Sequence, residues 1–220
     1  MIKQGRDAKP IKNEDRIDIS SKYGHKASDH WYYTALLNFR SQFAEGFNYP
    51  NDSVVISKFL APGYVIVALG MDYKPNDYFS FFISPATARF IIVTDKILSD
   101  AGAFGVDSGE TVETQVGAYA KIAFKKDLSK TVNLQTTLDA FSNYLDKPQN
   151  IVVNWQMLLS LKVSKFISAS LATQLIYDDK TKLVFYKGDG TTVDHTGPGI
   201  QFKEVLGIVF AYRFSGVTVK

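Results

Sequence analysis

The side chains that most often carry catalysis or bind metals are few in this 220-residue chain, and they lie apart from one another. Its three histidines, His25, His30 and His195, all fall in segments whose composition predicts turns or loops. None shares an expected strand face with a carboxylate at a spacing that metal ligands use. The histidines therefore do not predict a metal centre.

Nucleophilic chemistry has equally little support in the sequence. Ser, His and Asp are present, but no G-x-S-x-G turn exposes a serine. The absence of Cys excludes thiol chemistry, disulfides and Cys-ligated zinc. Residues 187–190 with Asp194 resemble part of a calcium loop, but the D-x-[DN]-x-[DN]-G spacing and the distal Glu are missing. We therefore expect no enzyme activity, no cofactor and no metal.

A different set of charged residues lies within segments that alternate polar and apolar side chains. In a membrane barrel such polar faces line an interior, whereas in a soluble sandwich they face water. Cations outnumber carboxylates in this set, so an anion-favouring lumen is one hypothesis, and charges that pair and fill the lumen are the other. The residues expected to face the lumen are Arg40, Asp72, Arg89, Glu113, Lys121, Asp139, Lys162, Lys203 and Arg213.

The elements that would position these charges are strands. In residues 31–43, Trp31, Tyr33 and Leu37 alternate with Thr34 and Asn38, a period of two that a helix would not produce. In residues 78–93 the alternation slips at Ser84-Pro85, which predicts a β-bulge that turns Arg89 inward. The segments predicted to be strands are 16–23, 31–43, 59–73, 78–93, 111–124, 131–145, 151–163, 168–177 and 200–214.

The last of these segments, 200–214, is as long as a strand that crosses a bilayer at a tilt. It ends aromatic-x-aromatic-x-aromatic, as rim residues at a membrane interface do. Short turns alternate along the chain with longer loops, which is typical of up-and-down outer-membrane barrels. We expect the following residues of this closing strand to face lipid: Leu206, Ile208, Phe210, Tyr212 and Phe214.

Composition agrees with a β-protein and excludes several other classes. Hydrophobic residues make up 45% of the chain and aromatic residues 14%, which excludes global disorder and suits aromatic girdles. A net charge of +3 with no basic run gives no reason to expect nucleic-acid binding. The longest apolar run, residues 65–71, is too short for a membrane-spanning helix.

Five stretches also resemble a family of Gram-negative outer-membrane β-barrels that is catalogued only as a domain of unknown function. They are DHWYYTALLNFRSQFAEGFNYPND, FLAPGYVIVALGMDYKPNDYFSFFISPATA, DAGAFGV, FSNYLDKPQNIVVNW and QFKEVLGIVFAYRF. The resemblance extends over about residues 14–214 and includes loops as well as strands. It implies a barrel in the bacterial outer membrane and implies no activity.

The chain departs from that family at both ends. Its first residues contain no apolar signal-peptide core, and about nine strands is an odd number for a single-chain bacterial barrel. We therefore expect that a signal peptide and about three initial strands of a barrel of about twelve are missing. The expected organisation is a polar segment or strand stub (1–15), a transmembrane antiparallel up-and-down β-barrel (16–214) and an extension (215–220).

Three functional hypotheses remain open at this point. The first is a channel or transporter with a polar lumen, and the second is a structural or accessory barrel that binds a partner through its long loops. The third is a soluble lipid-binding β-barrel, which would point its apolar faces inward. For the first two, the expected partners are the lipid bilayer and the barrel-assembly machinery, which would recognise the C-terminal strand.

Overall fold

The computed structural model describes residues 15–47, 53–181, 183–188 and 192–210, and these residues form an antiparallel sheet with almost no helix. The sheet has nine strands in the order β1-β2-β5-β6-β7-β8-β9-β10-β13. This confirms the all-β, up-and-down arrangement. The strands are β1 (Ile17–Lys26), β2 (Trp31–Ser41), β5 (Gly63–Asn76), β6 (Phe79–Ile92), β7 (Val112–Asp127), β8 (Val132–Asn143), β9 (Ile151–Lys162), β10 (Ile167–Tyr177) and β13 (Ile200–Phe210).

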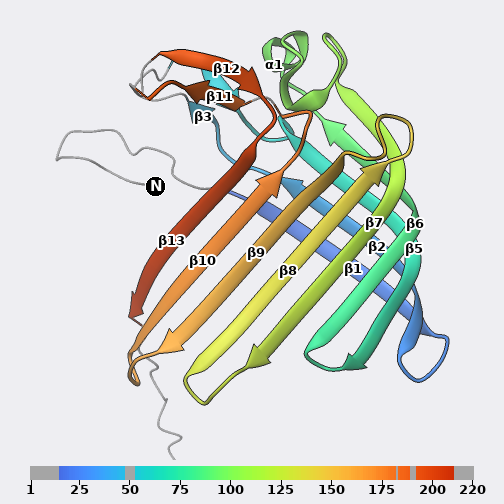
Figure 1. The fold of residues 1–220 in the computed structure, drawn as a ribbon, viewed down its shortest axis with the longest axis vertical. Coiled ribbons are helices and arrows are strands. Elements are labelled where there is room, and N and C mark those ends of the chain that lie inside the picture. Colours follow the sequence, from blue (N-terminus) through green and yellow to red (C-terminus); the bar gives the residue numbers. More distant parts are fainter. Residues whose placement is uncertain (1–14, 48–52, 182, 189–191, 211–220) are drawn as a thin grey trace, which may run out of the picture.

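The sheet curls strongly, so that β1, β2 and β5 lie behind β8, β9 and β10 in Figure 1. Within the described residues, β1 and β13 form the two edges and do not pair with each other. The described strands therefore form an open sheet and not a closed barrel. The sequence predicts about nine strands of a barrel of about twelve, which on their own would also leave two free edges. We call the two sides of the curled sheet its inner and outer faces.

A β-bulge interrupts β6, as the slipped alternation predicts. The register shifts between Ser84 and Thr87 where β6 pairs with β7, and opposite Gly70 where it pairs with β5. Gly70 is needed there, because a Cβ atom at this position would lie 2.0 Å from the carbonyl oxygen of Ile83. Beyond the bulge Arg89 is buried, with 8% of its surface exposed.

The two ends of the sheet differ. Tight connections at residues 27–30, 77–78, 128–131 and 163–166 define the tight-turn end, and all longer connections lie at the opposite, long-loop end. The sequence predicts plain loops there, but the structure contains short elements. These are the hairpins β3 (Gly46–Phe47)–β4 (Val55–Ser57) and β11 (Leu183–Tyr186)–β12 (Val193–Gly197), the helix α1 (Lys96–Asp100) and the 3₁₀ turn η1 (Ala103–Gly105).

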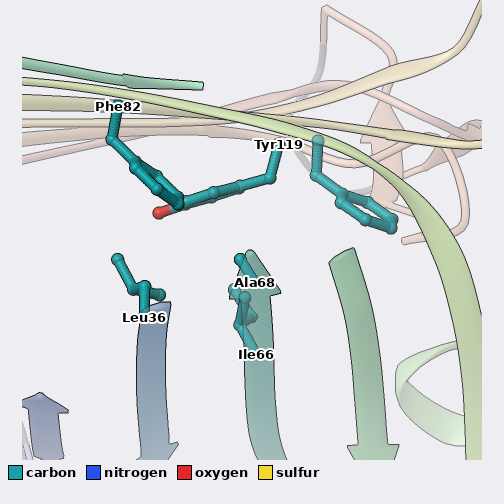
Figure 2. Packing of buried hydrophobic residues seen from close by; sticks show 6 residues of the cluster. Leu36, Ile66, Ala68, Phe82 and Tyr119 are labelled. Atoms are coloured by element: carbon teal, nitrogen blue, oxygen red, sulfur yellow. The ribbon is translucent and has the colours of Figure 1, made fainter. Parts of the chain in front are cut away.

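Part of the inner face is filled by an apolar cluster. Figure 2 shows Leu36 of β2 and Ile66 of β5 pointing toward Phe82 of β6 and Tyr119 of β7 across the curl. Ala68 of β5 and Phe141 of β8 complete the cluster, and all six side chains are buried. Because it joins strands that are not sheet neighbours, this cluster holds the curvature of the sheet.

Candidate functional site

The outer face exposes a broad apolar surface. Leu69, in the middle of β5, is 60% exposed, and Leu206 and Ile208 on β13 are 75% and 79% exposed. Soluble monomers rarely expose large contiguous apolar patches. Further exposed members of this face are Ile19, Tyr33, Leu37, Val67, Ile83, Val116, Leu161 and Phe210.

Aromatic pairs gather at the tight-turn end of this surface. The Lys126 ammonium also lies 4.1 Å from the centroid of the Tyr78 ring, so a cation accompanies the aromatic residues. Aromatic rings with a polar or charged neighbour are typical of the interface between lipid and water. The pairs, with their ring-centroid separations, are Trp31–Tyr73 (4.9 Å), Tyr78–Phe124 (5.8 Å) and Phe166–Phe210 (6.2 Å).

The inner face holds charges that pair across strands. Asp72 of β5 is fully buried, and its carboxylate lies 2.8 Å from Lys22 Nζ on β1 and 3.2 Å from Lys74 Nζ. Lys22 Nζ also lies 5.1 Å from the centroid of the Phe82 ring. Two cations thus offset a carboxylate that would otherwise be costly to bury.

A second pair lies on β7 and β8. Lys121 and Asp139 are direct cross-strand partners, with 3.3 Å between Lys121 Nζ and Asp139 Oδ1. The Tyr119 hydroxyl donates a hydrogen bond to the same carboxylate. Three of the side chains predicted to face a lumen, Asp72, Lys121 and Asp139, therefore have partners.

At the long-loop end, residues 178–181 reach back from the end of β10 across the sheet. Asp178 accepts a hydrogen bond from Arg89 of β6 at 3.3 Å. Lys180 Nζ lies 3.1 Å from Glu113 of β7 and 3.2 Å from Asp146 in the loop after β8. Because β6 and β7 are separated from β10 in the sheet order, this segment spans the inner side. We call residues 178–181 the strap.

Charge keeps the strap in place. Partial burial acts to lower the pKa of Lys180, but the hydrogen bonds to Glu113 and Asp146 outweigh it and raise that pKa above its usual value. Lys180 therefore stays a cation at neutral pH. The sequence suggested the inward direction of Arg89 and Glu113, but not their partners Asp178 and Lys180, because a mixed-charge loop gives no sign of the strand it meets.

Amide side chains occupy part of the inner face of β9 and β10, beside apolar residues such as Leu158 and Ile176. Asn154 Oδ1 on β9 accepts hydrogen bonds from Gln174 Nε2 of β10 at 3.0 Å and from Gln156 Nε2 at 3.4 Å. This half of the inner face is more open than the half that the apolar cluster fills. Polar alternation predicted the sidedness of these residues but did not single them out.

The remaining predicted residues are scattered. Arg40 Nε donates to Asn38 Oδ1 at 3.2 Å, whereas Lys162 lies exposed at the tight-turn end of β9 and Lys203 lies exposed on β13. Three further predicted residues lie outside the described part of the chain: Tyr212, Arg213 and Phe214.

The histidines and acidic residues form no metal cluster in the described part of the chain. No three potential ligands come together there in a way that could hold a metal ion. His195 stacks on Phe185 at 4.6 Å and lies 2.9 Å from the neighbouring Asp194. Among the same residues, no helix is long and apolar enough to cross a membrane.

A family described as "Protein of unknown function (DUF3078)" matches residues 1–47. The match includes β1, β2 and β3 and supports a domain of unknown function, without an activity. Neither the curated proteins nor the solved structures give a significant match to the chain.

Proposed function

We propose that this chain is an outer-membrane β-barrel protein without a catalytic site. The exposed apolar outer face carries this proposal. In a water-soluble lipid-binding barrel the same side chains would point inward, yet Leu69, Leu206 and Ile208 point away from the buried cluster. Strands of ten to sixteen residues supply the length that a tilted crossing requires.

A membrane address also sets a condition on the two sheet edges. Unpaired backbone N–H and C=O groups are not tolerated in lipid. In the bilayer, β1 and β13 are therefore covered by further strands or by each other. We propose closure into a barrel, with the tight turns facing the periplasm and the long loops facing outward.

The interior favours a binding or structural role over an open pore. Lys22, Lys121 and Arg89 are paired with carboxylates, and the apolar cluster fills the half of the interior between β2 and β8. The strap crosses the inner side of the sheet at the long-loop end and narrows the space inside the curl there. We therefore propose that the long loops, rather than a conducting lumen, make the contacts that matter for function.

Single cysteines test the sidedness directly, because the chain has no Cys of its own. The Leu69→Cys variant is labelled with bimane and placed in vesicles that contain doxyl-labelled phospholipid. We expect strong quenching by the lipid and weak quenching by aqueous iodide. The matched variants are Gln174→Cys, on the inner face, and Leu145→Cys, in the loop between β8 and β9, and both should show the opposite behaviour. Quenching of Gln174→Cys by lipid with protection of Leu69→Cys would reject the proposed sidedness.

Planar bilayers separate the binding role from the channel role. We expect no stable single-channel conductance from the purified protein at neutral pH. A reproducible ohmic conductance would refute the proposal of a filled interior and support the channel hypothesis. The reversal potential would then give the ion selectivity of the channel.

A further inference from the structure

A cavity of about 290 Å³ lies on the inner side near the long-loop end, between the sheet and the strap. We propose that this cavity binds a small organic carboxylate that has an apolar body. The proposal does not depend on the membrane address, because the groups that define the site are the same in a soluble fold. Residues that line it include Arg40, Tyr64, Arg89, Phe141, Asn154 and Ile176.

An unpartnered donor points to a ligand that accepts hydrogen bonds. Asn154 is 7% exposed, and its Nδ2 atom is buried without a hydrogen-bond partner among the described residues. Its Oδ1 atom is already used by the side chains of Gln156 and Gln174, so the amide is oriented with Nδ2 free. A buried donor without a partner is energetically costly, because it has lost its hydrogen bond to water and gained none in the protein. A carboxylate oxygen in the cavity would satisfy it.

A spare cation lies at the same cavity. Asp178 pairs with Arg89, and Asp139 pairs with Lys121. Asp18, the cross-strand neighbour of Arg40, forms its ion pair with Arg16 and interacts with Arg40 only at longer range. No described carboxylate forms an ion pair with Arg40.

The guanidinium of Arg40 therefore offers donors to an incoming anion. It gives one hydrogen bond to the protein, from Nε to Asn38 Oδ1. Its two terminal nitrogens bond no described residue. These two nitrogens suit the paired oxygens of a carboxylate, which a guanidinium can contact in a bidentate manner.

The other residues that line the cavity indicate which kind of ligand fits beside the carboxylate. Phe141, Ile66, Val152 and Ile176 are apolar, and the ring of Tyr64 lies beside Arg89, 5.7 Å from the guanidinium carbon. Small-molecule sites combine mostly apolar walls with a few convergent polar groups. A carboxylic acid with a compact ring or a short chain fits this wall, whereas inorganic phosphate has no apolar group that could contact it.

Equilibrium dialysis of the full chain in detergent tests the proposal, with radiolabelled sodium benzoate as the probe. We expect saturable binding of benzoate at one site. Arg40→Gln and Asn154→Asp should each raise the Kd at least tenfold, because each removes a hydrogen bond to the charged carboxylate of the ligand, and Asn154→Asp also adds electrostatic repulsion. Lys162→Gln, which makes the same charge change as Arg40→Gln on an exposed side chain, should stay within about twofold.

Each result of this experiment bears on the proposal. The proposal would be overturned if the wild type did not bind benzoate, or if Arg40→Gln and Asn154→Asp bound it as tightly as the wild type does. Benzyl alcohol that binds as tightly as benzoate would show that no anion is recognised. If sodium phosphate bound as tightly as benzoate, the site would not require a ligand with an apolar body. Arg40→Gln keeps the test independent of any folding defect in Asn154→Asp, because its side chain is only half-buried.

Discussion

The replacement of Leu69 by arginine distinguishes lipid from water at the outer face. Leu69 lies at the middle of β5, which spans Gly63–Asn76, and 60% of its surface is exposed. Its direct neighbours on β2 and β6 are Ala35 and Ala86, so no long polar side chain is at hand to stabilise a charge. An arginine there would project from the sheet without a partner.

The loss of stability caused by Leu69→Arg depends on whether lipid or water surrounds the outer face. An arginine on the lipid face of a barrel near the bilayer midplane costs about 2–4 kcal/mol, whereas a substitution at an exposed site in water changes stability by about 0.5 kcal/mol or less. The lower bound of the lipid figure corresponds to a loss of about thirtyfold in the folding equilibrium. With a urea dependence of about 1–3 kcal/mol per molar, the unfolding midpoint should fall by about 1 M.

Urea titration of the protein in phospholipid vesicles, followed by tryptophan fluorescence, measures this shift. Leu145→Arg is the matched control, because Leu145 is 73% exposed but lies in the loop between β8 and β9. Its midpoint should not move. Equal midpoints for wild type and Leu69→Arg would refute the assignment of the outer face to lipid, as would a wild-type protein that is monomeric and stable without detergent.

Three further predictions concern stability. Lys22→Met should destabilise the fold by about 3 kcal/mol, because it leaves the fully buried Asp72 with one cation. The double variant Lys22→Met/Asp72→Leu should recover most of this lost stability in the same urea titration. Gly70→Ala should lower the urea midpoint and disturb the β6 bulge in amide exchange, because its Cβ meets a backbone oxygen that cannot move freely. The pKa of Asp95 is lowered by the hydrogen bonds from Lys58 and from the Leu98 N–H. Ionised Asp95 therefore contributes fully to loop stability above the ordinary Asp pKa of about 3.9, and this contribution is lost as the pH falls through the lowered pKa. Pepsin should therefore cut residues 93–111 faster as the pH falls below about 4, and Asp95→Asn should remove that pH dependence.

The sequence predicts the strands well because alternation is a local property. Trp31 to Leu37 shows which residues share a face without any knowledge of the neighbouring strand. The bulge at Ser84-Pro85 was predictable for the same reason, since a slip of one residue changes the face of every later side chain. Nine strands were expected, and nine are present in the described sheet.

The partners of the inner charges could not be predicted in the same way. Arg89 meets Asp178, a residue far along the chain, only because the strap folds back over several strands. Lys22 meets Asp72 across two strand pairings, whose registers depend on the packing of all three strands. Alternation gives the face of a residue, whereas a contact requires the register and the curl.

The same limit applies to the curvature of the sheet. A period of two specifies that a sheet has an apolar side and a polar side, but the curl is fixed by contacts between distant strands, such as Leu36 with Phe82 and Tyr119. These contacts join β2 with β6 and β7, so the N-terminal half of the interior is tightly held. The C-terminal strands instead present amides such as Gln174, which leave room beside the open edge. The interior is therefore divided into a half that the apolar cluster packs and a half that mixes amides with apolar side chains such as Val205, and a strand that closed the barrel at β13 would meet the second half first.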